Sequence, residues 1–390
     1  MTHPPAAPDP AGPGGYVLGV DSGGSGLRVA LGRVGLSGPL ATTVCAEPVR
    51  TGPGGIDAGH LLEQLLPAAR ELLDRATAAA SGEAGSDSAQ TDARPSGSRA
   101  DGAPAYEVEA VAIGAAGMAT LGERLRAELP GALADALGVR RVALAADAVT
   151  AYAGAVGQRP GAVVAGGTGM IALGTDLKEW HRADGWGHLL GDSGGGAWIG
   201  RAGLDAAMRA HDGRRGGSAA LLDRLRAVFG PAEELPGLLY PRSDRPAVLA
   251  SFAPEVAACA GADPVAAGIL RQAAGHIAEA AAAVCPTPAG MGVEAGEGGG
   301  EAGEVALTGG LFRMGEPLVA PLREELARLL PGARVTAETG DPLTGALRIA
   351  RALAAGDLRL PRHPTMLFVP SEHENGQHGG TAVREKPRTG

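Results

Sequence analysis

The sequence contains one strand–glycine turn–strand pattern twice, once near its N-terminus and once near its middle. Short apolar strands are expected at 16–20 and 27–32, and again at 163–165 and 170–173. Each pair is joined by a turn rich in glycine and hydroxyl residues. A P-loop leads from a strand into a helix, whereas these turns lead into a second strand, as in a β-hairpin. The repetition predicts two related lobes, each containing a glycine hairpin.

The rest of the chain alternates between strand-like and helix-like segments, as α/β proteins do. Short apolar runs at 108–113, 142–145 and 305–308 predict three more strands. We therefore expect an α/β fold. Apolar residues at helical spacing predict helices at 59–80, 121–137, from 148 onward, and at 198–210, 219–228, 264–284, 317–330 and 342–354.

Four segments lack the apolar content that would offset the entropy of ordering them. They are a Pro/Ala/Gly-rich start at 1–15, a Gly/Ser/Asp run at 81–104, a Gly/Glu-rich insertion at 286–303 and a polar stretch from 363 onward. The predicted domains are an N-terminal lobe of 16–120 and 341–360, a C-terminal lobe of 121–340, and a polar tail of 361–390.

Charge and hydropathy exclude several functions. The 43 acidic residues exceed the 34 basic ones, and the net charge of −9 argues against a nucleic-acid or anionic-membrane partner. The chain has no apolar run of transmembrane length and no signal-peptide pattern, so we expect a cytoplasmic protein. Its three cysteines form no CxxC pair, which argues against a zinc or iron–sulfur site within one chain.

Lysine is nearly absent, which bears on how a nucleotide could be bound. The two lysines are Lys178 and Lys386. Neither lies in a GxxxxGK[ST] sequence, so the chain is not a P-loop ATPase. Neither is placed to pair phosphates as in a protein kinase. These two common nucleotide-binding folds are therefore excluded.

The first glycine turn is the run Asp21-Ser22-Gly23-Gly24-Ser25-Gly26. Glycines allow positive φ and let backbone N–H groups approach an anion, and Ser22 and Ser25 can add hydroxyl donors. Asp21 ends a buried strand, where it is placed to hold Mg²⁺ through water, because that ion keeps much of its hydration shell. A plain Asp/Gly hairpin turn explains this segment equally well by itself.

The second glycine turn, Gly166-Gly167-Thr168-Gly169, offers the same cradle, with Thr168 as a hydroxyl donor to phosphate or substrate. Paired with the first turn, it favours two turns that grip one triphosphate. A third glycine motif, the pair Gly309-Gly310, follows the strand at 305–308. Missing side chains there would let a flat base lie close to the backbone. A plain β–α connection explains that pair equally well.

Asp147 follows the strand at 142–145 and precedes the helix that begins near Ala148. Aspartate is common as an N-cap at such a position, and this is the favoured explanation for the residue in isolation. The functional alternative is a general base that accepts a proton from an attacking hydroxyl. Phosphoryl transfer needs little beyond positioning, charge neutralisation and such a base.

The densest motif spans 184–200, where glycines surround Trp186, His188 and Asp192. A segment that only builds core has no need of so many glycines. Carboxylates and imidazoles bind sugar hydroxyls well, because both form directional hydrogen bonds. Asp192 can take two adjacent hydroxyls or an ammonium group; the alternative is an ordinary loop histidine and a helix-capping aspartate. The candidate substrate residues are Thr168, Trp186, Gly187, His188, Asp192 and Ser193.

Taken in order, these segments resemble the sugar-kinase branch of the actin–Hsp70–hexokinase superfamily. Within it they resemble the BadF/BadG/BcrA/BcrD-type ATPases and the N-acetylglucosamine and glucosamine kinases. The resemblance covers roughly 16–356 without the two insertions, and its most specific element is the GWGHLLGD run at 185–192. It implies two actin-like (ribonuclease H-like) lobes with ATP and sugar in the cleft between them, a helix at 342–354 that returns to the N-terminal lobe, and a homodimer.

The resemblance also implies a role for each matched segment. The two glycine turns match the two phosphate loops, 308–310 matches the adenosine motif, and the motif around Asp192 matches the sugar-contacting loop. Asp147 falls where the family's catalytic aspartate lies, so it would draw the proton from the sugar 6-OH as this attacks the γ-phosphorus of MgATP. The implied ATP-binding residues are Ser22, Gly23, Gly24, Ser25, Gly26, Gly166, Gly167, Thr168, Gly169, Gly309 and Gly310.

Two departures from the N-acetylglucosamine kinases concern the sugar. Those kinases carry Glu where this chain has Ser193, and Asn near the place where it has Gly54-Gly55. A pocket changed at Ser193 suits a free 2-amino group better than an acetamide, and an ammonium would form charge-assisted hydrogen bonds with Asp192. The composition resembles that of GC-rich actinobacteria, where the resemblance implies glucosamine kinases. We predict conversion of glucosamine to glucosamine 6-phosphate, with N-acetylglucosamine as the alternative.

Two functions from other classes stay open at this point. Some relatives are ATPases that activate a dehydratase through an iron–sulfur cluster, which needs cysteine ligands at a shared interface. Cys45, Cys259 and Cys285 do not show such a spacing. A non-catalytic sugar sensor can lose the base or a phosphate loop, whereas Asp147 and both glycine turns are present here.

Overall fold

The computed structural model describes residues 15–23, 26–52, 55–83, 106–286, 303–337 and 340–370. The chain divides into two compact units, each an α/β structure with its own sheet. This confirms the predicted α/β fold with two lobes. Unit 1 comprises Met1–Asp147, Ala346–Leu358 and Arg362–Gly390, and unit 2 comprises Ala148–Gly345 and Arg359–Pro361.

Unit 1 contains a six-stranded sheet in the order β13-β7-β6-β1-β2-β3. The first predicted hairpin forms its centre, with β1 antiparallel to β2 and parallel to β6. Nearly all residues of β1 and β6 are buried, and such continuous apolar strands are easily predicted. The strands are β1 (Tyr16–Gly23), β2 (Gly26–Arg33), β3 (Ala41–Cys45), β6 (Val108–Ala115), β7 (Arg141–Ala146) and β13 (Leu367–Phe368), with a separate pair β4 (Thr51–Gly52) and β5 (Gly55–Ile56).

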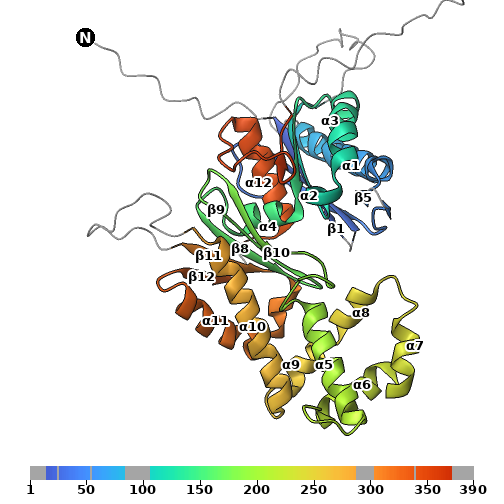
Figure 1. The fold of residues 1–390 in the computed structure, drawn as a ribbon. Coiled ribbons are helices and arrows are strands. Elements are labelled where there is room, and N and C mark those ends of the chain that lie inside the picture. Colours follow the sequence, from blue (N-terminus) through green and yellow to red (C-terminus); the bar gives the residue numbers. More distant parts are fainter. Residues whose placement is uncertain are drawn as a thin grey trace, which may run out of the picture. The chain divides into compact units, whose positions relative to one another are not determined.

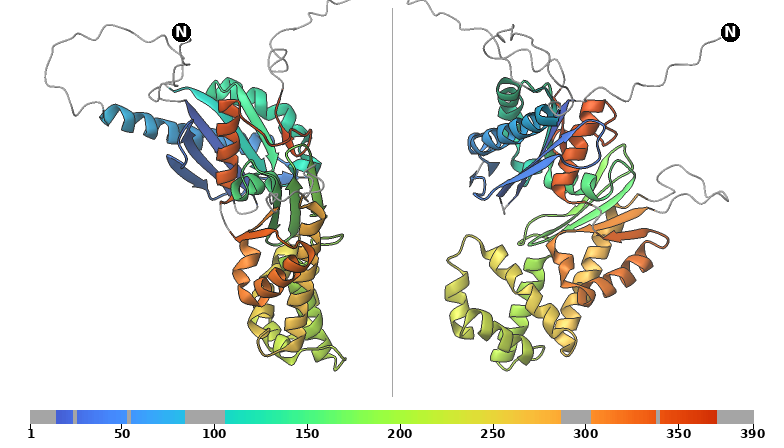
Figure 2. Two further views of the ribbon diagram at one scale, coloured as in Figure 1. Left: turned by 90° about the vertical axis from the view of Figure 1, so that its left-hand side faces the viewer. Right: turned by 180° about the vertical axis from the view of Figure 1, so that it is seen from behind.

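Helices cover both faces of this sheet, with α12 on one side and α1 and α3 on the other (Figures 1 and 2). Helix α12 lies so close to β1 that a Cβ on Gly19 would be 2.5 Å from the backbone nitrogen of Leu347, so glycine is required there. Arg351 of the same helix donates to three carbonyls of the turn at 33–38 and fixes it. The helices are α1 (Ala58–Glu83), α2 (Met118–Leu121), α3 (Glu123–Leu137) and α12 (Pro342–Ala355).

The structure corrects the predicted boundaries between the lobes. The sequence places α3 and β7 in the C-terminal lobe of 121–340, but β7 pairs with β6 in the sheet of unit 1, which therefore continues to Asp147. The polar tail predicted from 361 contains a strand, because β13 pairs with β7. A two-residue strand leaves no periodic signal in the sequence. Most of the predicted unstructured segments lies outside the described residues, at 1–14, 84–105, 287–302 and 371–390.

Unit 2 contains a five-stranded sheet in the order β10-β9-β8-β11-β12. The second predicted hairpin is present, with β8 antiparallel to β9 and parallel to β11. The sequence does not predict β10, because its residues WHRAD are mostly polar and none is fully buried. The strands are β8 (Gly161–Gly166), β9 (Met170–Thr175), β10 (Trp180–Asp184), β11 (Glu304–Thr308) and β12 (Arg334–Ala337).

A set of helices completes unit 2. Helix α10 (Pro264–Val284) packs on β8, β9 and β10 and against α11 (Glu316–Leu329). Helices α5 to α9 pack together beside them, around the buried side chains of Ile199 and Phe252 (Figure 1). The sequence predicts α5 and α6 but misses α7, α8 and α9, which are too short to show a clear period. The bounds are α4 (Asp147–Ala155), α5 (Gly196–His211), α6 (Ala219–Phe229), α7 (Leu235–Leu239), α8 (Arg245–Ser251) and α9 (Ala253–Cys259).

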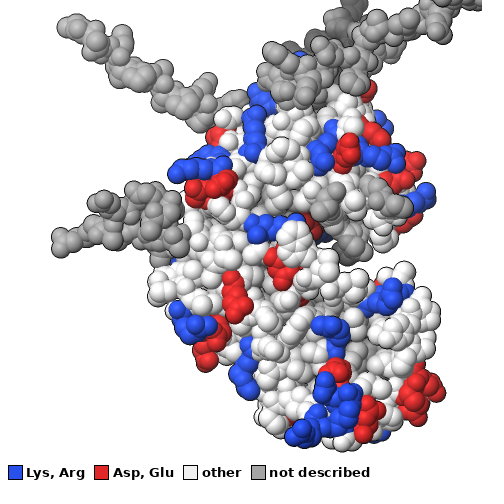
Figure 3. All heavy atoms as spheres, in the orientation of Figure 1, with Lys and Arg blue, Asp and Glu red and all other residues white. Residues whose placement is uncertain are grey.

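Charges of both signs are mixed over the face drawn in Figure 3, where Lys and Arg lie beside Asp and Glu. Many form local ion pairs, such as Arg209 with Asp205 one turn earlier on α5. Exposed pairs of this kind contribute at most about 1 kcal/mol each. Among the described helices, none is long and apolar enough to cross a membrane.

Candidate active site

The second glycine turn lies at the end of β8, and two of its N–H groups are open. Gly167 N–H donates to Gly169 O at 2.9 Å, across the turn. The carbonyls of Gly167 and Thr168 accept from the first two N–H groups of α5, so the turn caps that helix. Within the described chain, the N–H groups of Thr168 and Gly169 donate to no acceptor, and Thr168 is exposed. Adjacent open N–H groups in a turn form an anion-binding concavity.

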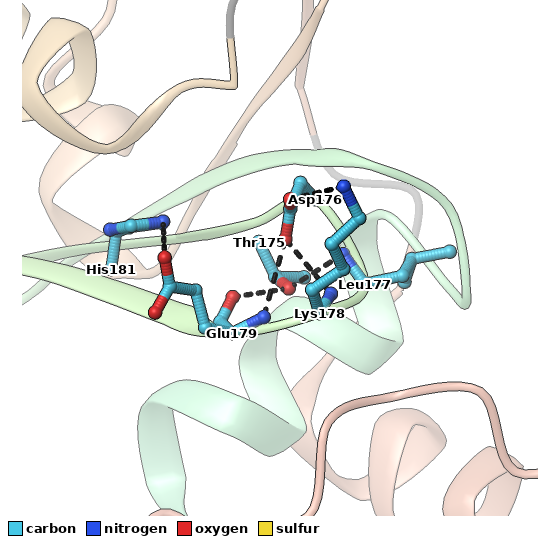
Figure 4. Close-up of polar contacts among 6 residues, drawn as sticks. All are labelled: Thr175, Asp176, Leu177, Lys178, Glu179 and His181. Atoms are coloured by element: carbon cyan, nitrogen blue, oxygen red, sulfur yellow. Dashed lines mark hydrogen bonds and ion pairs between the residues drawn. The ribbon is translucent and has the colours of Figure 1, made fainter. Parts of the chain in front are cut away.

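The turn between β9 and β10 fixes the register of β10 (Figure 4). The buried Thr175 hydroxyl donates to Glu179 O at 2.6 Å and accepts from Leu177 N–H at 2.9 Å. Asp176 accepts from two further N–H groups of the turn. Strand β10 then pairs with β9 as far as Asp184, which lies opposite the second residue of β9. The register therefore returns the chain to within two residues of the glycine turn.

Asp184 ends β10 and ties together the two ends of the following loop, residues 185–195. Its carboxylate accepts from Asp192 N–H at 2.6 Å and from Ser193 N–H at 2.9 Å. Asp184 and Asp192 have positive φ angles of 60° and 54°, which few residues except glycine adopt, although aspartate tolerates them. Side-chain-to-backbone bonds thus hold this loop where regular secondary structure does not.

Asp192 directs its carboxylate at the glycine turn. Its Oδ1 accepts from Gly187 N–H at 3.1 Å, within the loop. Its Oδ2 occupies the place where a Cβ on Gly169 would be, well inside the 3.0 Å that real Cβ atoms keep from other atoms. Glycine at 169 therefore allows the carboxylate to lie directly against the turn that carries the open N–H groups. A predicted sugar-binding residue and a predicted phosphate-binding turn are in contact.

Partial burial is the main cause that raises the pKa of Asp192 above its ordinary value. The hydrogen bond from Gly187 N–H lowers this pKa, the Asp184 carboxylate raises it, and positive charge on His188 and Arg182 lowers it. The net rise means that the ionised carboxylate is incompletely solvated. Ligand hydroxyl or ammonium groups would supply the missing hydrogen bonds, and perturbed carboxylates of this kind are typical of functional sites.

Arg182 on β10 supports the start of the loop. Arg182 donates to the backbone carbonyls of Asp184 and Gly185, both at 3.0 Å, and its Cζ lies 4.0 Å from the centroid of the Trp186 ring, a cation–π contact. Trp186 is 62% exposed, and Leu189 and Leu190 are 83% and 84% exposed. Large apolar side chains this open beside a carboxylate are typical of ligand-contacting surfaces.

The predicted adenosine motif lies beside the second glycine turn, because β11 runs parallel to β8 and ends at the same level. Thr308 of β11 pairs with Ala165 of β8. Gly309, with φ 102°, approaches the Gly166 carbonyl so closely that a Cβ would not fit, whereas a Cβ on Gly310 would meet open space. Ligands of parallel α/β sheets bind at such carboxyl ends of strands.

In unit 1, Asp21 lies directly across the hairpin from Arg28. The Oδ2 atom of Asp21 accepts from Arg28 Nη2 at 2.6 Å and from Nε at 3.0 Å. Among the residues that the structure describes, no three His, Cys, Asp or Glu side chains gather as a metal site. Mg²⁺ in nucleotide sites needs only one or two carboxylates, with water and phosphate oxygens as the other ligands. A single carboxylate held in place by an arginine fits that requirement.

The other predicted residues of the first turn are placed as follows. Ser22 is buried within β1, and Gly23 and Gly26 end β1 and begin β2. Gly24 and Ser25, at the tip, lie outside the described residues. The predicted phosphate contacts of this turn stay predictions.

Asp147 is the first residue of α4 and directly follows β7. Its side chain is exposed, whereas the following Ala148 is buried. Ala115 at the end of β6 pairs with Ala146 at the end of β7, so Asp147 stands where two parallel strands end together. The position suits a catalytic carboxylate and equally a carboxylate at a helix N-terminus, so its role stays a prediction.

The sequence model of the BadF/BadG/BcrA/BcrD ATPase family matches residues 18–347. The match includes both glycine turns, Asp147 and the loop 185–195. The chain belongs to the BadF/BadG/BcrA/BcrD ATPase family. This confirms the resemblance on which the two-lobed fold was predicted.

Known proteins similar to this family member include several sugar kinases. A Chromobacterium violaceum structure, provisionally assigned as an N-acetylglucosamine kinase, has a TM-score of 0.57 and 27% identity, covering 86% of this chain and 98% of its own. A Porphyromonas gingivalis structure with the same provisional assignment has a TM-score of 0.56 and 16% identity, covering 85% and 97%, and supports the fold alone. A Clostridium acetobutylicum N-acetylmuramic acid/N-acetylglucosamine kinase is 43% identical over 70 residues, which span 17% of this chain and 22% of that protein.

Within unit 2, three predicted motifs meet: the second glycine turn, the Gly309-Gly310 pair and the loop with Asp192. The ring of His188 forms no hydrogen bond with any described residue, and the residue is half-buried. The motifs did not indicate a role for Arg182 or Asp184, which hold the loop. The available signal was a pair of charged residues directly before a glycine-rich loop, which is weak without the strand that carries them.

Proposed function

We propose that this chain is an ATP-dependent kinase that phosphorylates a hydroxyl of an amino sugar. The observation that supports the proposal is the contact of Asp192 with Gly169, since Asp192 is the carboxylate that we propose to bind sugar and the turn has open N–H groups. Phosphoryl transfer needs this adjacency, because the reacting atoms must approach to about 3–3.5 Å. Membership of an ATPase family and the kinases among its relatives support the same function.

The acceptor that we propose first is glucosamine, converted to glucosamine 6-phosphate. Burial raises the pKa of Asp192, so an ammonium group beside its carboxylate would offset the lost solvation with a charge-assisted hydrogen bond. Ser193 next to it is small, and its N–H is already bound by Asp184. N-acetylglucosamine is the second candidate, and the names of the relatives favour it.

In the proposed reaction, the open N–H groups of Thr168 and Gly169 bind phosphate oxygens and the Gly309-Gly310 pair lies along the base. In unit 1, Asp21 would hold Mg²⁺ through water. When bound, that ion neutralises charge on the β- and γ-phosphates. Exclusion of water from the site would favour transfer to the sugar over hydrolysis.

Asp147 is the proposed general base. It accepts the proton of the sugar 6-hydroxyl as the oxygen attacks the γ-phosphorus, and ADP leaves. A positioned base of this kind contributes about 10²–10⁴-fold to rate. The sugar itself is bound by Asp192 and His188, with Trp186 beside them, so loss of the base should affect turnover more than binding.

The rival functions are less well supported. Activation of a dehydratase through an iron–sulfur cluster needs thiolate ligands, but Cys285 is buried and burial raises its pKa to about 11. An anaerobic iron assay tests this alternative. A sugar sensor is tested by turnover itself. The proposed homodimer rests on the resemblance alone, and sedimentation of the purified chain tests it.

The decisive experiment is an ADP-release assay with glucosamine, N-acetylglucosamine, glucose and mannosamine. We expect saturable, sugar-dependent ADP release, with the highest kcat/KM for glucosamine. The Asp147→Asn variant should lose about 10²–10⁴-fold in kcat while its sugar affinity stays within a few-fold. Absence of ADP with every hexosamine contradicts the kinase proposal. A preference for N-acetylglucosamine would change the proposed substrate but not the proposed kinase activity. Full activity of Asp147→Asn would show that Asp147 is not the general base.

A further inference from the structure

The direction of the Asp192 side chain must be set by its contacts, because residues 185–195 form no helix or strand. We infer that Asp184 is a positioning residue for the acceptor: by binding the N–H groups of Asp192 and Ser193 it sets the orientation in which Asp192 meets the sugar. The inference rests on the proposed function, since it concerns the acceptor site of that reaction. Asp184 itself need not touch the sugar.

The first support is the backbone conformation at both ends of the bond. Asp184 and Asp192 are both left-handed, and Leu177 is the other non-glycine residue with positive φ in the described chain. Such a conformation persists only where surrounding contacts over-determine it. At Asp192 those contacts are the Asp184 carboxylate on its N–H, at 2.6 Å, and Gly187 N–H on its Oδ1, at 3.1 Å.

The second support is that the chain makes room for the Asp184 carboxylate. A Cβ on Gly191 would overlap with Asp184 Oδ1, so glycine at 191 is what lets the carboxylate reach the N–H of the next residue. At the other end, Arg182 holds the carbonyl of Asp184 and that of Gly185, both at 3.0 Å. The contacts therefore form a continuous series from β10, through Asp184, to the carboxylate that lies on Gly169.

A purely conformational role for Asp184 predicts a different outcome in variants. Asp184→Gly keeps the left-handed conformation without strain but removes the carboxylate. Asp184→Asn keeps an aspartate-like tolerance of that conformation and one acceptor oxygen, but turns an NH₂ group toward one of the two N–H donors. If only conformation matters, the glycine variant should match the wild type. If the carboxylate positions Asp192, both variants should bind sugar poorly.

Asp176 offers a matched control on the same hairpin. Its carboxylate also accepts from two backbone N–H groups, those of Lys178 and Glu179, but at the opposite end of β10 (Figure 4). Both bonds are accepted by Oδ1, which asparagine would keep, so the third variant is Asp176→Ala, which removes the same kind of interaction away from the site. It should affect stability to a similar extent and leave the KM of both substrates unchanged.

The test measures KM for glucosamine and for ATP, glucosamine affinity by calorimetry without ATP, and Tm, for all three variants. We expect Asp184→Gly and Asp184→Asn to lower the sugar kcat/KM by about ten- to a hundredfold, as a misplacement near 1 Å can do, with ATP KM within about threefold. Wild-type sugar affinity in Asp184→Gly overturns the inference. An equal loss of kcat/KM for both substrates, in proportion to the fall in Tm, also overturns it. Failure of the wild-type chain to bind or phosphorylate any hexosamine overturns the proposed function, and this inference with it.

Discussion

A methyl group added to Gly169 is predicted to displace Asp192 while the rest of the glycine turn stays in place. The Cβ of an alanine would overlap with Asp192 Oδ2, and the oxygen must retreat by about 1 Å to reach ordinary contact at 3.4 Å. The overlapping atom is the end of a side chain, which can rotate, so no backbone has to move. Position 169 also lacks the positive φ that would strain an alanine.

The size of the effect follows from what the carboxylate is proposed to bind. Loss of one hydrogen bond to a charged group costs about 1.5–3 kcal/mol. Since about 1.4 kcal/mol corresponds to a factor of ten, the sugar kcat/KM of Gly169→Ala should fall about ten- to a hundredfold. The free energy of unfolding should change only modestly. Overpacking costs about 1–3 kcal/mol, and restriction of the unfolded chain returns about 0.4–1 kcal/mol, so Tm should fall by a few degrees at most.

Gly167→Ala is the matched control in the same turn. A Cβ on Gly167 would meet no atom within 4 Å, so this variant should fold and bind sugar like the wild type. The open space is where we place the phosphates, so its ATP KM should rise. The assay is steady-state ADP release with each substrate varied in turn. Wild-type sugar kcat/KM in Gly169→Ala, or the same kinetic profile in both variants, would refute the reasoning.

Two further predictions concern stability and pH. Thr175→Val removes a buried hydroxyl with two hydrogen bonds and should lower the free energy of unfolding by about 1–3 kcal/mol in urea titrations, with Thr175→Ser closer to wild type. Burial raises the pKa of Asp192, so the sugar kcat/KM should fall on the acid side with an apparent pKa above the ordinary aspartate value of about 3.9. Because this pKa is raised in the folded protein, Asp192 contributes favourably to the free energy of unfolding below pH about 3.9. That contribution is lost as the pH rises through the raised pKa. An acid limb at or below about 3.9 contradicts this assignment.

The elements that could be predicted from the sequence are those whose signal is local. The strands of both glycine hairpins are continuous apolar runs with glycine at their ends, and α10 has a long buried stripe of helical period. Strand β10 gave no such signal, because Trp180–Asp184 is polar and is held by its register with β9. The lobe boundary was wrong because membership of β7 in the sheet of unit 1 depends on its pairing with β6, a long-range contact.

The candidate site shows the same division. The chemistry of Asp192 and the flexibility of Gly169 are visible in the sequence, and so both were singled out. Their contact is not visible, because it depends on β10 returning the chain beside the turn and on left-handed backbone at Asp184 and Asp192. The role proposed for Asp184 was hidden for the same reason. Its partners are backbone N–H groups eight and nine residues away, and such partners cannot be predicted from residue types.

Under the proposed function, the packing in unit 2 predicts that acceptor and nucleotide contacts are energetically coupled. The first N–H groups of α5 bind the carbonyls of Gly167 and Thr168, and the Asp192 carboxylate lies on Gly169, so the glycine turn contacts both the helix and the acceptor residue. A phosphate on the open N–H groups would restrict the same backbone that supports the carboxylate. By linkage, whatever factor the nucleotide adds to sugar affinity, the sugar adds to nucleotide affinity. We expect Gly169 to carry this coupling, because a side chain there would overlap with the Asp192 carboxylate.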